Sequence, residues 1–485
     1  MQRALRDREV LEGDVDRLKQ QLGHLSIQLN ESHTQLRWME HTRSWTATQP
    51  LRDGASAARQ SIQLAKALPK HVFQFVDRAR GGGMIDAARW LKDVVKATVE
   101  PVEADQTSFY RRQLRTILTR YGDRPIIVAP PLVDWNVPLF QRPQHLAMAL
   151  AREGFLYFYC TGNAVYDRYD GFVQVGPGCY ITNQADLVLE INRRKTIHLA
   201  STAMRIGLDF IRKTKQRGDW LLYEYIDEIH PDISGEIPRS AMQRHYALLA
   251  DKSVTCVATA DKLLRDVESV RDSNYGLVTN GVEYEHFARA RAGLPVPPEL
   301  QALTKSKRPV IGYFGALAKW FDYEMVRRLA RERPNYDILL IGFDYDGSLR
   351  EARLGQHKNV KVIGPINYRQ LPRYAQLFDV STIPFVINDI TESTSPIKLF
   401  EYMALGRPIV TSAMPECRKY DSCLIAESAA DFVAQVDAAL RLKTDASYLT
   451  TLRREAEANT WQSKAHEISK LLQTSFGVKP VRTNS

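Results

Sequence analysis

The stretch "TESTSPIKLFEYMALGRPIVTS" (residues 391–412) begins with a cluster of hydroxyl side chains and then becomes apolar. Ser395 is of a residue type preferred at helix N-caps, and Pro396 fits the first helical position, where a missing N–H is tolerated. Gly406 is the residue type that commonly follows the end of a helix. The stretch therefore predicts a helix from Pro396 to Leu405, followed by a strand.

Two charged side chains lie on the first turns of this predicted helix. The exposed start of a helix attracts anions through its free amides and its positive dipole end, and Lys398 adds a full positive charge there. Glu401 follows three residues later on the same face, about 4.5 Å along the axis. The pair suits a nucleoside diphosphate, with Lys398 binding the diphosphate and Glu401 accepting hydrogen bonds from the ribose hydroxyls. The alternative interpretation is an ordinary surface ion pair.

Short apolar strands alternate with helices on both sides of this stretch. A first block of strands ends near residue 280, and a second block begins near residue 308. Alternation of strand and helix predicts a parallel sheet covered on both faces, so the sequence predicts two doubly wound α/β domains in series. Their ligands would bind at the carboxyl ends of the strands. The predicted strands lie at 125–130, 155–160, 196–200, 220–226, 253–259 and 275–280 in the first block, and at 308–315, 337–342, 360–364, 379–385, 408–412 and 423–426 in the second.

The remainder of the chain adds helical regions at both ends. Apolar residues between Leu11 and Met39 recur with heptad spacing, which favours a coiled coil over 1–45 that pairs with another chain; the alternative is a long helix that folds back on its own domain. The predicted domains are this coiled coil, a basic helical region with a hinge at Gly81–Gly83 (46–121), a first Rossmann-like domain (122–290), a second Rossmann-like domain (291–440), and helices that cross back to the first domain (441–485).

Composition and charge exclude several classes of protein. The 485 residues include five scattered cysteines, without the close pairs of a zinc or redox site, which predicts a reducing, cytoplasmic compartment. The first residues lack the apolar core of a signal peptide, and no later run is long enough for a membrane span. The net charge is +10, and residues 41–100 alone hold ten Lys/Arg against five Asp/Glu. An anionic membrane surface and a plain solvated surface are equally good interpretations of that tract, whereas nucleic acid lacks a supporting motif.

In this context the chain resembles the retaining family 4 glycosyltransferases of the GT-B fold, in the branch associated with bacterial polysaccharide synthesis. Segments that carry the resemblance occur in the family's order from Asp123 to about Ser475. They are "WNVPLFQRPQHLAMALAREG", "YEYIDEI", "TNGVEYEHF", "IGYFGALAKWFDYEMVRRLARERPNYDILLIG", "NVKVIGPINYRQLPRYAQLFDVSTIPF" and the stretch 391–412. The resemblance implies two Rossmann-like domains, of which the first (122–290) would bind the acceptor and the second (291–440) would bind a nucleotide sugar as donor.

The resemblance also implies roles for particular residues. Lys398, with the residues around Thr394 and Ser395, would hold the diphosphate, and Glu401 would bind the ribose. Gly315 would let the backbone approach the phosphates or the sugar. The other donor-site residues that it implies are Lys319 near the phosphates, Gly364 and Pro365 near the base, and Ser393.

The chain departs from the family at one of these positions. The usual first glutamate, eight positions before Glu401, is Ser393 here, and Glu392 is one place out of register. A contact to the sugar is therefore missing or rearranged. Asp344 and Asp346 in "FDYDGS" resemble the metal-binding pair of a different glycosyltransferase fold, but a turn is the better interpretation in this context, so we expect no obligatory metal and no cofactor.

Three first-domain residues are further candidates. Arg142, at the predicted start of a helix, and Trp135, in the loop before it, could contact phosphate or acceptor; an arginine paired to an acid is the alternative for Arg142. Asp227, which follows a strand and is paired with Glu228, could serve as a general base if the enzyme inverts configuration; capping of the loop is the alternative for these carboxylates. Retaining chemistry needs no such base, because the leaving phosphate can take the acceptor proton.

The activity expected from the sequence is transfer of a sugar to a glycan or a lipid-linked glycan during cell-surface polysaccharide synthesis, in the cytoplasm or at the inner face of the membrane. A homo-oligomer would form through the coiled coil. Two alternatives are a non-catalytic scaffold of the same fold and a nucleotide-sugar epimerase.

Overall fold

The computed structural model describes residues 106–137, 140–202, 206–234 and 237–481. Residues 120–162 and 166–485 group into one compact unit, which contains both sheets described below. A helix over residues 106–121 precedes the first strand. No helix in the described ranges is long and apolar enough to cross a membrane. The coiled coil predicted for 1–45, the basic tract and Gly81–Gly83 all lie outside the described residues.

The first sheet is parallel except for one edge strand. Its order is β3-β4-β2-β1-β5-β6-β7-β8, and only the β3–β4 pair is antiparallel. From β1 the chain moves toward one edge and then returns to β5, so the direction of winding changes between the neighbours β1 and β5. The strands are β1 (Ile126–Ala129), β2 (Leu156–Cys160), β3 (Phe172–Gly176), β4 (Cys179–Thr182), β5 (Lys195–Ala200), β6 (Trp220–Tyr225), β7 (Thr255–Ala258) and β8 (Tyr275–Leu277).

The second sheet is parallel throughout. Its order is β11-β10-β9-β12-β13-β14, and the direction of winding changes between β9 and β12. Its strands are largely buried apolar runs, as expected for a sheet covered on both faces. They are β9 (Val310–Phe314), β10 (Asp337–Ile341), β11 (Val360–Ile363), β12 (Val380–Ile383), β13 (Ile409–Ser412) and β14 (Cys423–Ala426). The prediction of two doubly wound α/β domains is confirmed.

Helices connect the strands of both sheets. Those that belong with the first sheet are α6 (Arg142–Glu153), α7 (Ala185–Leu189), α8 (Leu208–Gln216), α9 (Pro231–Ser234), α10 (Arg239–Ala250) and α11 (Asp261–Glu268). The later helices are α12 (Tyr284–Ala288), α13 (Gln301–Ser306), α14 (Tyr323–Glu332), α15 (Ser348–Ala352), α16 (Leu371–Ala375), α17 (Asp389–Glu392), α18 (Ile397–Leu405), α19 (Ala429–Leu442), α20 (Ala446–Ala458) and α21 (Trp461–Phe476). Short 3-10 turns lie at 289–292, 298–300, 354–356 and 368–370.

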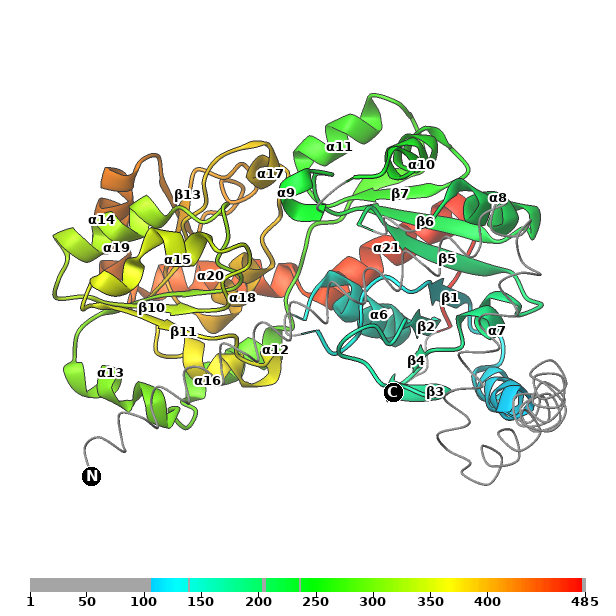
Figure 1. The fold of residues 1–485 in the computed structure, drawn as a ribbon, viewed down its shortest axis with the longest axis horizontal. Coiled ribbons are helices and arrows are strands. Elements are labelled where there is room, and N and C mark those ends of the chain that lie inside the picture. The colour runs from blue at the N-terminus through cyan, green and yellow to red at the C-terminus, as the bar shows by residue number, and fades with distance from the viewer. Residues whose placement is uncertain (1–105, 138–139, 203–205, 235–236, 482–485) are drawn as a thin grey trace, which may run out of the picture. The chain divides into compact units, whose positions relative to one another are not determined.

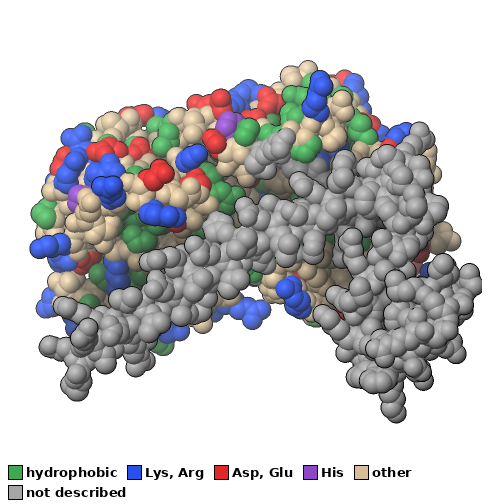
Figure 2. Space-filling model, viewed as in Figure 1, with side chains coloured by type: hydrophobic (Ala, Val, Ile, Leu, Met, Phe, Trp, Pro, Cys, Tyr) green, Lys and Arg blue, Asp and Glu red, His purple; other side chains and the backbone are tan. Residues whose placement is uncertain are grey.

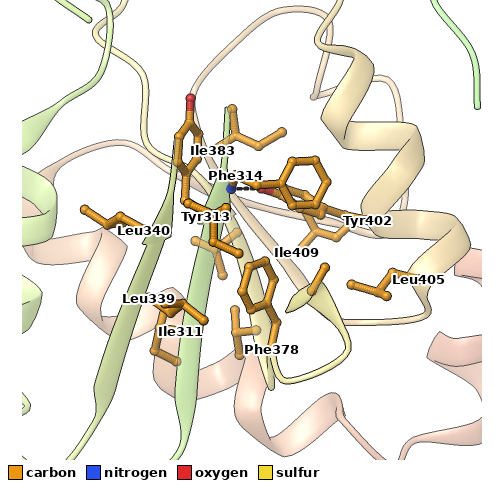
Figure 3. Close-up of a cluster of buried hydrophobic side chains, with 14 of the residues drawn as sticks. Ile311, Tyr313, Phe314, Leu339, Leu340, Phe378, Ile383, Tyr402, Leu405 and Ile409 are labelled. Atoms are coloured by element: carbon orange, nitrogen blue, oxygen red, sulfur yellow. Dashed lines mark hydrogen bonds between the residues drawn. The ribbon is translucent and has the colours of Figure 1, made fainter. Parts of the chain in front are cut away.

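The core of the second sheet holds α18 in place. Phe314 of β9 stacks on Phe378, and the ring of Tyr402 from α18 packs edge-on against Phe314 (Figure 3). The Phe314 backbone N–H also donates a hydrogen bond of 3.0 Å to the Tyr402 hydroxyl. This bond ties α18 to the last residue of β9, so the start of the helix has a fixed place at the carboxyl edge of the sheet.

The last two helices join the two sheets. Helix α20 packs on α18, whereas α21 packs along α6 (Figure 1). Trp461 and Ile468 of α21 are buried in the core of the first sheet. The prediction that the C-terminal helices cross back is therefore confirmed. On the visible described surface, basic and acidic side chains are interspersed (Figure 2).

Candidate active site

The candidate site lies where the winding of the second sheet changes direction. Ligands of open α/β sheets bind at this point, beyond the carboxyl ends of the two neighbouring strands. Here those strands are β9 and β12, which are followed by Gly315 and Phe385 respectively. Helix α18, which follows β12 in the chain, brings Lys398 to the same place, because Lys398 Nζ lies 4.9 Å from the ring centre of Phe385.

Lys398 rests on aromatic rings rather than on a carboxylate. Its Nζ lies 4.9 Å from the ring centre of Phe385 and 5.6 Å from that of Tyr313. Such cation–π contacts hold an ammonium group while leaving its N–H donors free. Among the described residues Lys398 forms no ion pair within 4 Å, so the alternative interpretation of Lys398 and Glu401 as a surface ion pair is wrong. The ammonium is available to an anionic ligand.

Two glycines allow the backbone to approach this lysine. A Cβ on Gly315 would lie 2.9 Å from Lys398 Cε, and the residue has φ +138°, which side chains disfavour. A Cβ on Gly342, at the end of β10, would lie 1.8 Å from the carbonyl oxygen of Gly315. Only glycine fits at these two positions, and the approach of the Gly315 backbone to phosphates or sugar stays a prediction.

The start of α18 differs by one residue from the prediction. Pro396 is the N-cap and Ile397 is the first helical residue, so neither Ser395 as cap nor Pro396 as first residue is correct. Ser395 is instead held by Asn280, whose backbone N–H donates to Ser395 Oγ (3.3 Å) and whose Nδ2 donates to the Ser395 carbonyl (2.6 Å). No side chain caps the helix, so its first amides remain available to an anion.

Burial brings the proton affinities of Lys398 and Glu401 close together. It lowers the pKa of Lys398 to about 8, although the charges of Glu401 and Asp227 act in the opposite direction. It raises the pKa of Glu401 to about 8, against the influence of Lys398. Glu401 is only 5% exposed. Both side chains are therefore poorly solvated without forming a bond to one another, which suits groups that bind a charged and hydroxylated ligand.

The acids that follow β6 also face this region. Burial raises the pKa of Asp227 to about 6, while Arg142 and Lys398 lower it, so Asp227 lies within electrostatic reach of Lys398. Its neighbour Glu228 accepts a hydrogen bond of 3.0 Å from Ser393 Oγ. The structure therefore brings the Asp227 and Glu228 pair, predicted to follow a strand, close to Lys398 and Ser393 respectively.

Arg142 and Trp135 are not available to a ligand. Arg142 is 1% exposed, donates to Glu224 Oε1 at 2.7 Å, and also donates to the carbonyl of Thr279. Trp135 is 7% exposed, and its ring packs edge-on against Tyr159. The role in phosphate or acceptor binding predicted for both is wrong, and the alternative for Arg142, pairing with an acid, is confirmed.

The remaining predicted residues lie on the surface of the second sheet. Gly364 and Pro365 are exposed after β11, the edge strand. Lys319 has an exposed side chain, and its backbone N–H donates to Asp346 Oδ2 at 2.9 Å. Asp344 accepts hydrogen bonds from the amides of residues 347, 349 and 350. The interpretation of Asp344 and Asp346 as turn residues is therefore confirmed.

Thr394 is also bonded within its own segment, since its hydroxyl donates to the Ile390 carbonyl at 2.7 Å. Any contribution of Thr394 to phosphate binding would come from its backbone.

A small pocket lies where the winding of the first sheet changes direction. It is lined by the ends of β1 and β5 and by a buried polar chain, in which Tyr157 bonds His198 at 2.8 Å and His198 lies 2.9 Å from Glu224. The Arg142 guanidinium and His198 hold the pKa of Glu224 down at about 2, in spite of its burial. The sequence did not indicate this chain, because its members come from three different strands.

Asn280 is a second residue that the sequence did not single out. Its Oδ1 accepts from Arg142 Nη1 at 3.2 Å, which orients the amide so that Nδ2 points to Ser395. The only available signal was its place in "TNGVEYEHF", the segment that leads from the first sheet into the second.

Comparisons with known proteins agree with this arrangement. Residues 308–442 match the family model described as "Glycosyl transferases group 1". A protein of Bacillus subtilis (strain 168), named putative teichuronic acid biosynthesis glycosyltransferase TuaH, is 26% identical over 267 residues. That match covers 52% of this chain and 66% of the relative, just under two thirds of its length.

Solved structures show the same fold. Sucrose-phosphate synthase from Thermosynechococcus elongatus aligns with a TM-score of 0.56 at 16% identity, over 73% of this chain and 99% of that protein. Anabaena HepE, solved in complex with UDP, aligns with a TM-score of 0.53 at 14% identity, over 72% of this chain and all of HepE. The described fold therefore resembles that of the GT-B glycosyltransferases, and residues 308–442 are the part of the chain that matches the group 1 glycosyl transferase model.

Proposed function

We propose that this chain is a glycosyltransferase that takes a sugar from a nucleoside-diphosphate donor and moves it to a glycan or lipid-linked glycan during cell-surface polysaccharide synthesis. The observation that carries the proposal is Lys398, which lies without a carboxylate partner at the uncapped start of α18 and beside Gly315. Two further findings support it. Residues 308–442 match a glycosyltransferase family, and the TuaH relative is named for polysaccharide synthesis.

In this proposal the start of α18 stabilises the departing nucleoside diphosphate. Negative charge grows on the leaving diphosphate as its bond to the sugar breaks, so a fixed cation and oriented amides bind the transition state more tightly than the ground state. Lys398 is partly buried, and this burial lowers its pKa to about 8. Its charge therefore acts on the diphosphate with little screening by water. Glu401, one turn further along, would accept hydrogen bonds from the ribose hydroxyls.

The acceptor would bind on the first-sheet side of the donor, near Asp227. From the family resemblance we infer retention of configuration, in which an oxygen of the leaving phosphate takes the acceptor proton. Asp227→Asn should then lower kcat by less than about tenfold, whereas loss of a general base would cost about 100-fold or more. NMR assignment of the anomer formed at the first turnover checks the same point independently.

Nucleotide binding tests the function directly. A thermal-shift screen over nucleoside diphosphates and their sugars should identify one base that stabilises the protein through linkage. Lys398→Met should weaken that ligand about 10- to 100-fold in calorimetry, the loss expected for a charge-assisted contact. Methionine retains most of the apolar stem, so packing on Phe385 is largely preserved.

Lys358→Met is the matched control, because Lys358 is an exposed lysine in the turn that precedes β11 of the same sheet. Equal affinities in wild type and Lys398→Met would refute the site. Release of nucleotide that depends on an added acceptor would separate a transferase from a scaffold of the same fold and from an epimerase.

A further inference from the structure

A carboxylate from the first sheet lies against the segment that leads into α18. Ser393 Oγ is 3.0 Å from Glu228 Oε2 and 2.9 Å from the Asp389 carbonyl, so its single proton can be given to either. Ser393 is fully buried, whereas about a quarter of the Glu228 side chain is exposed. Glu228 therefore approaches Ser393 from the solvent side.

Lys262 holds the same carboxylate from a third direction. Its Nζ lies 4.0 Å from Glu228 Oε2, and it also contacts Asp389 Oδ1 at 3.1 Å and Glu392 Oε2 at 3.8 Å. The Ser393 hydroxyl and the Lys262 ammonium therefore both contact Oε2 of Glu228. The other oxygen, Oε1, accepts no hydrogen bond from the described part of the chain, and it remains available as an acceptor.

The direction of a bound donor places its sugar near this oxygen. If the diphosphate lies at the start of α18, Glu401 fixes the ribose on the helix side. The sugar, attached to the other end of the diphosphate, must then extend toward the residues that precede the helix. Ser393 is five positions before Lys398, and Glu228 is its hydrogen-bond partner.

We propose that Glu228 recognises the transferred sugar of the donor, accepting hydrogen bonds from its hydroxyl groups through Oε1, while Ser393 and Lys262 position the carboxylate. This inference rests on the proposed function. A serine at position 393 is too short to supply a carboxylate, but its hydroxyl can orient one that comes from the loop after β6. An ionised carboxylate accepts strongly from hydroxyl groups, and two adjacent sugar hydroxyls can share it.

The competing explanation is a tether that only joins the two sheets. Lys262 and Asp389 already form a contact between α11 and α17 without Glu228. A tether would affect free nucleotide and nucleotide sugar alike. A sugar contact would affect only the ligand that carries the sugar.

Calorimetry with Glu228→Gln distinguishes these explanations. The probes are UDP, GDP and the glucose, galactose, N-acetylglucosamine and mannose esters of each, and the pair that wild type binds is taken forward. Glu228→Gln should bind the free nucleotide within about twofold of wild type and bind the nucleotide sugar at least about tenfold more weakly. Ser393→Ala should show a smaller loss in the same direction, and the two changes together should be less than additive.

Glu392→Gln is the matched control, because Glu392 also lies within 4 Å of Lys262 but accepts no hydrogen bond from the Ser393 hydroxyl. It should leave both affinities unchanged. Equal weakening of nucleotide and nucleotide sugar in Glu228→Gln, no change in either, or the same pattern in Glu392→Gln would overturn the inference. If wild type binds none of these nucleotides, the proposed function itself fails, and this result is distinct from the others.

Discussion

At the scale of single residues, the site combines two groups whose charges burial disfavours. Lys398 and Glu401 are three positions apart on one helix, both with a pKa moved to about 8, and no bond joins them. In a helix that served only the core, apolar residues of similar volume would be at least as stable. Lys398 and Glu401 do not bond to one another, so each can bind a ligand group instead. A ligand with an anionic group for Lys398 and hydroxyl groups for Glu401 would satisfy both.

Glu401→Gln tests the ribose role by its dependence on one hydroxyl. Glutamine preserves size but loses the charge, and each charge-assisted hydrogen bond is worth about 1.5–3 kcal/mol. The variant should therefore bind the nucleoside diphosphate about tenfold or more weakly, yet lose much less affinity for the 2′-deoxy analogue, which has already lost one hydroxyl. Calorimetry on all four combinations measures the coupling. Equal losses for both ligands would show that Glu401 does not contact the 2′-hydroxyl.

Asp227 should make stability depend on pH in a specific direction. Its pKa is raised from 3.8 to about 6, so the folded protein binds more protons than the unfolded chain between these values. The ionised carboxylate therefore destabilises the fold above about pH 6 and has no such effect below about pH 4. Asp227→Asn should raise the melting temperature at pH 7.5, by an amount equivalent to roughly 1 kcal/mol after allowance for partial exposure.

The gain from Asp227→Asn should shrink as the pH is lowered toward 4. Asp232→Asn, which changes a more exposed acid in the next helix, is the control and should show no such trend. A gain for Asp227→Asn that stayed constant from pH 7.5 to 4 would contradict the raised pKa.

At the scale of elements, local patterns identified most strands and the helix that carries Lys398. Apolar runs between helical segments located all six strands of the second sheet, because strand, turn and helix signals there are contiguous in sequence. The same pattern missed β3 and β4, which form an antiparallel edge hairpin between parallel strands. The residues of β3 are half-buried or exposed, so no apolar run marks it.

The prediction that Ser395 caps α18 failed because a residue distant in the sequence determines the contacts of Ser395. Ser395 carries every local signal of an N-cap, but Asn280, 115 positions away, takes its hydroxyl and its carbonyl. Arg142 also begins a helix, yet its buried guanidinium bonds to Glu224, which lies 82 positions away. Neither outcome can be read from spacing within one element, because the partner arrives only when the sheets assemble.

Asn280→Asp tests whether this distant contact positions the start of α18. Aspartate retains the oxygen that accepts from Arg142 but loses the N–H that donates to the Ser395 carbonyl. It also places a negative charge close to that carbonyl. We expect nucleotide affinity to fall about tenfold, the effect of misplacing a binding group whose own chemistry is unchanged.

Asn359→Asp is the matched control for Asn280→Asp. Asn359 Nδ2 also donates to backbone carbonyls, those of residues 330, 333 and 336, but at the opposite end of the second sheet. It should lower the melting temperature without changing nucleotide affinity in calorimetry. If both variants lose stability and neither loses affinity, Asn280 has a structural role only.

At the scale of the whole molecule, α20 and α21 make the two sheets depend on one another. Only a short segment separates the two helices, yet α20 packs on α18 in the second core and α21 packs on α6 in the first. The backbone at Val282 also bonds to the chain at 459 and 461, so the segment leading into the second sheet and the returning helix are joined. The Rossmann-like region should therefore unfold with coupled transitions rather than as two independent halves.

Residues 1–45 give a separate prediction about assembly. Their apolar positions from Leu11 to Met39 repeat with heptad spacing, and glycines at 13 and 23 make an isolated helix unfavourable. Pairing with a second copy would bury the apolar stripe and compensate for those glycines.

Deleting residues 1–45 should therefore reduce the mass measured by light scattering to that of one chain. Nucleotide affinity should stay within about twofold, because Lys398 and Glu401 belong to the compact unit formed by residues 120–162 and 166–485. As a control, Leu22→Ala with Leu29→Ala in the full chain removes two seam positions without changing length and should weaken assembly in the same direction. An unchanged mass in the deletion variant would mean that the stripe packs within its own chain or that the copies meet elsewhere.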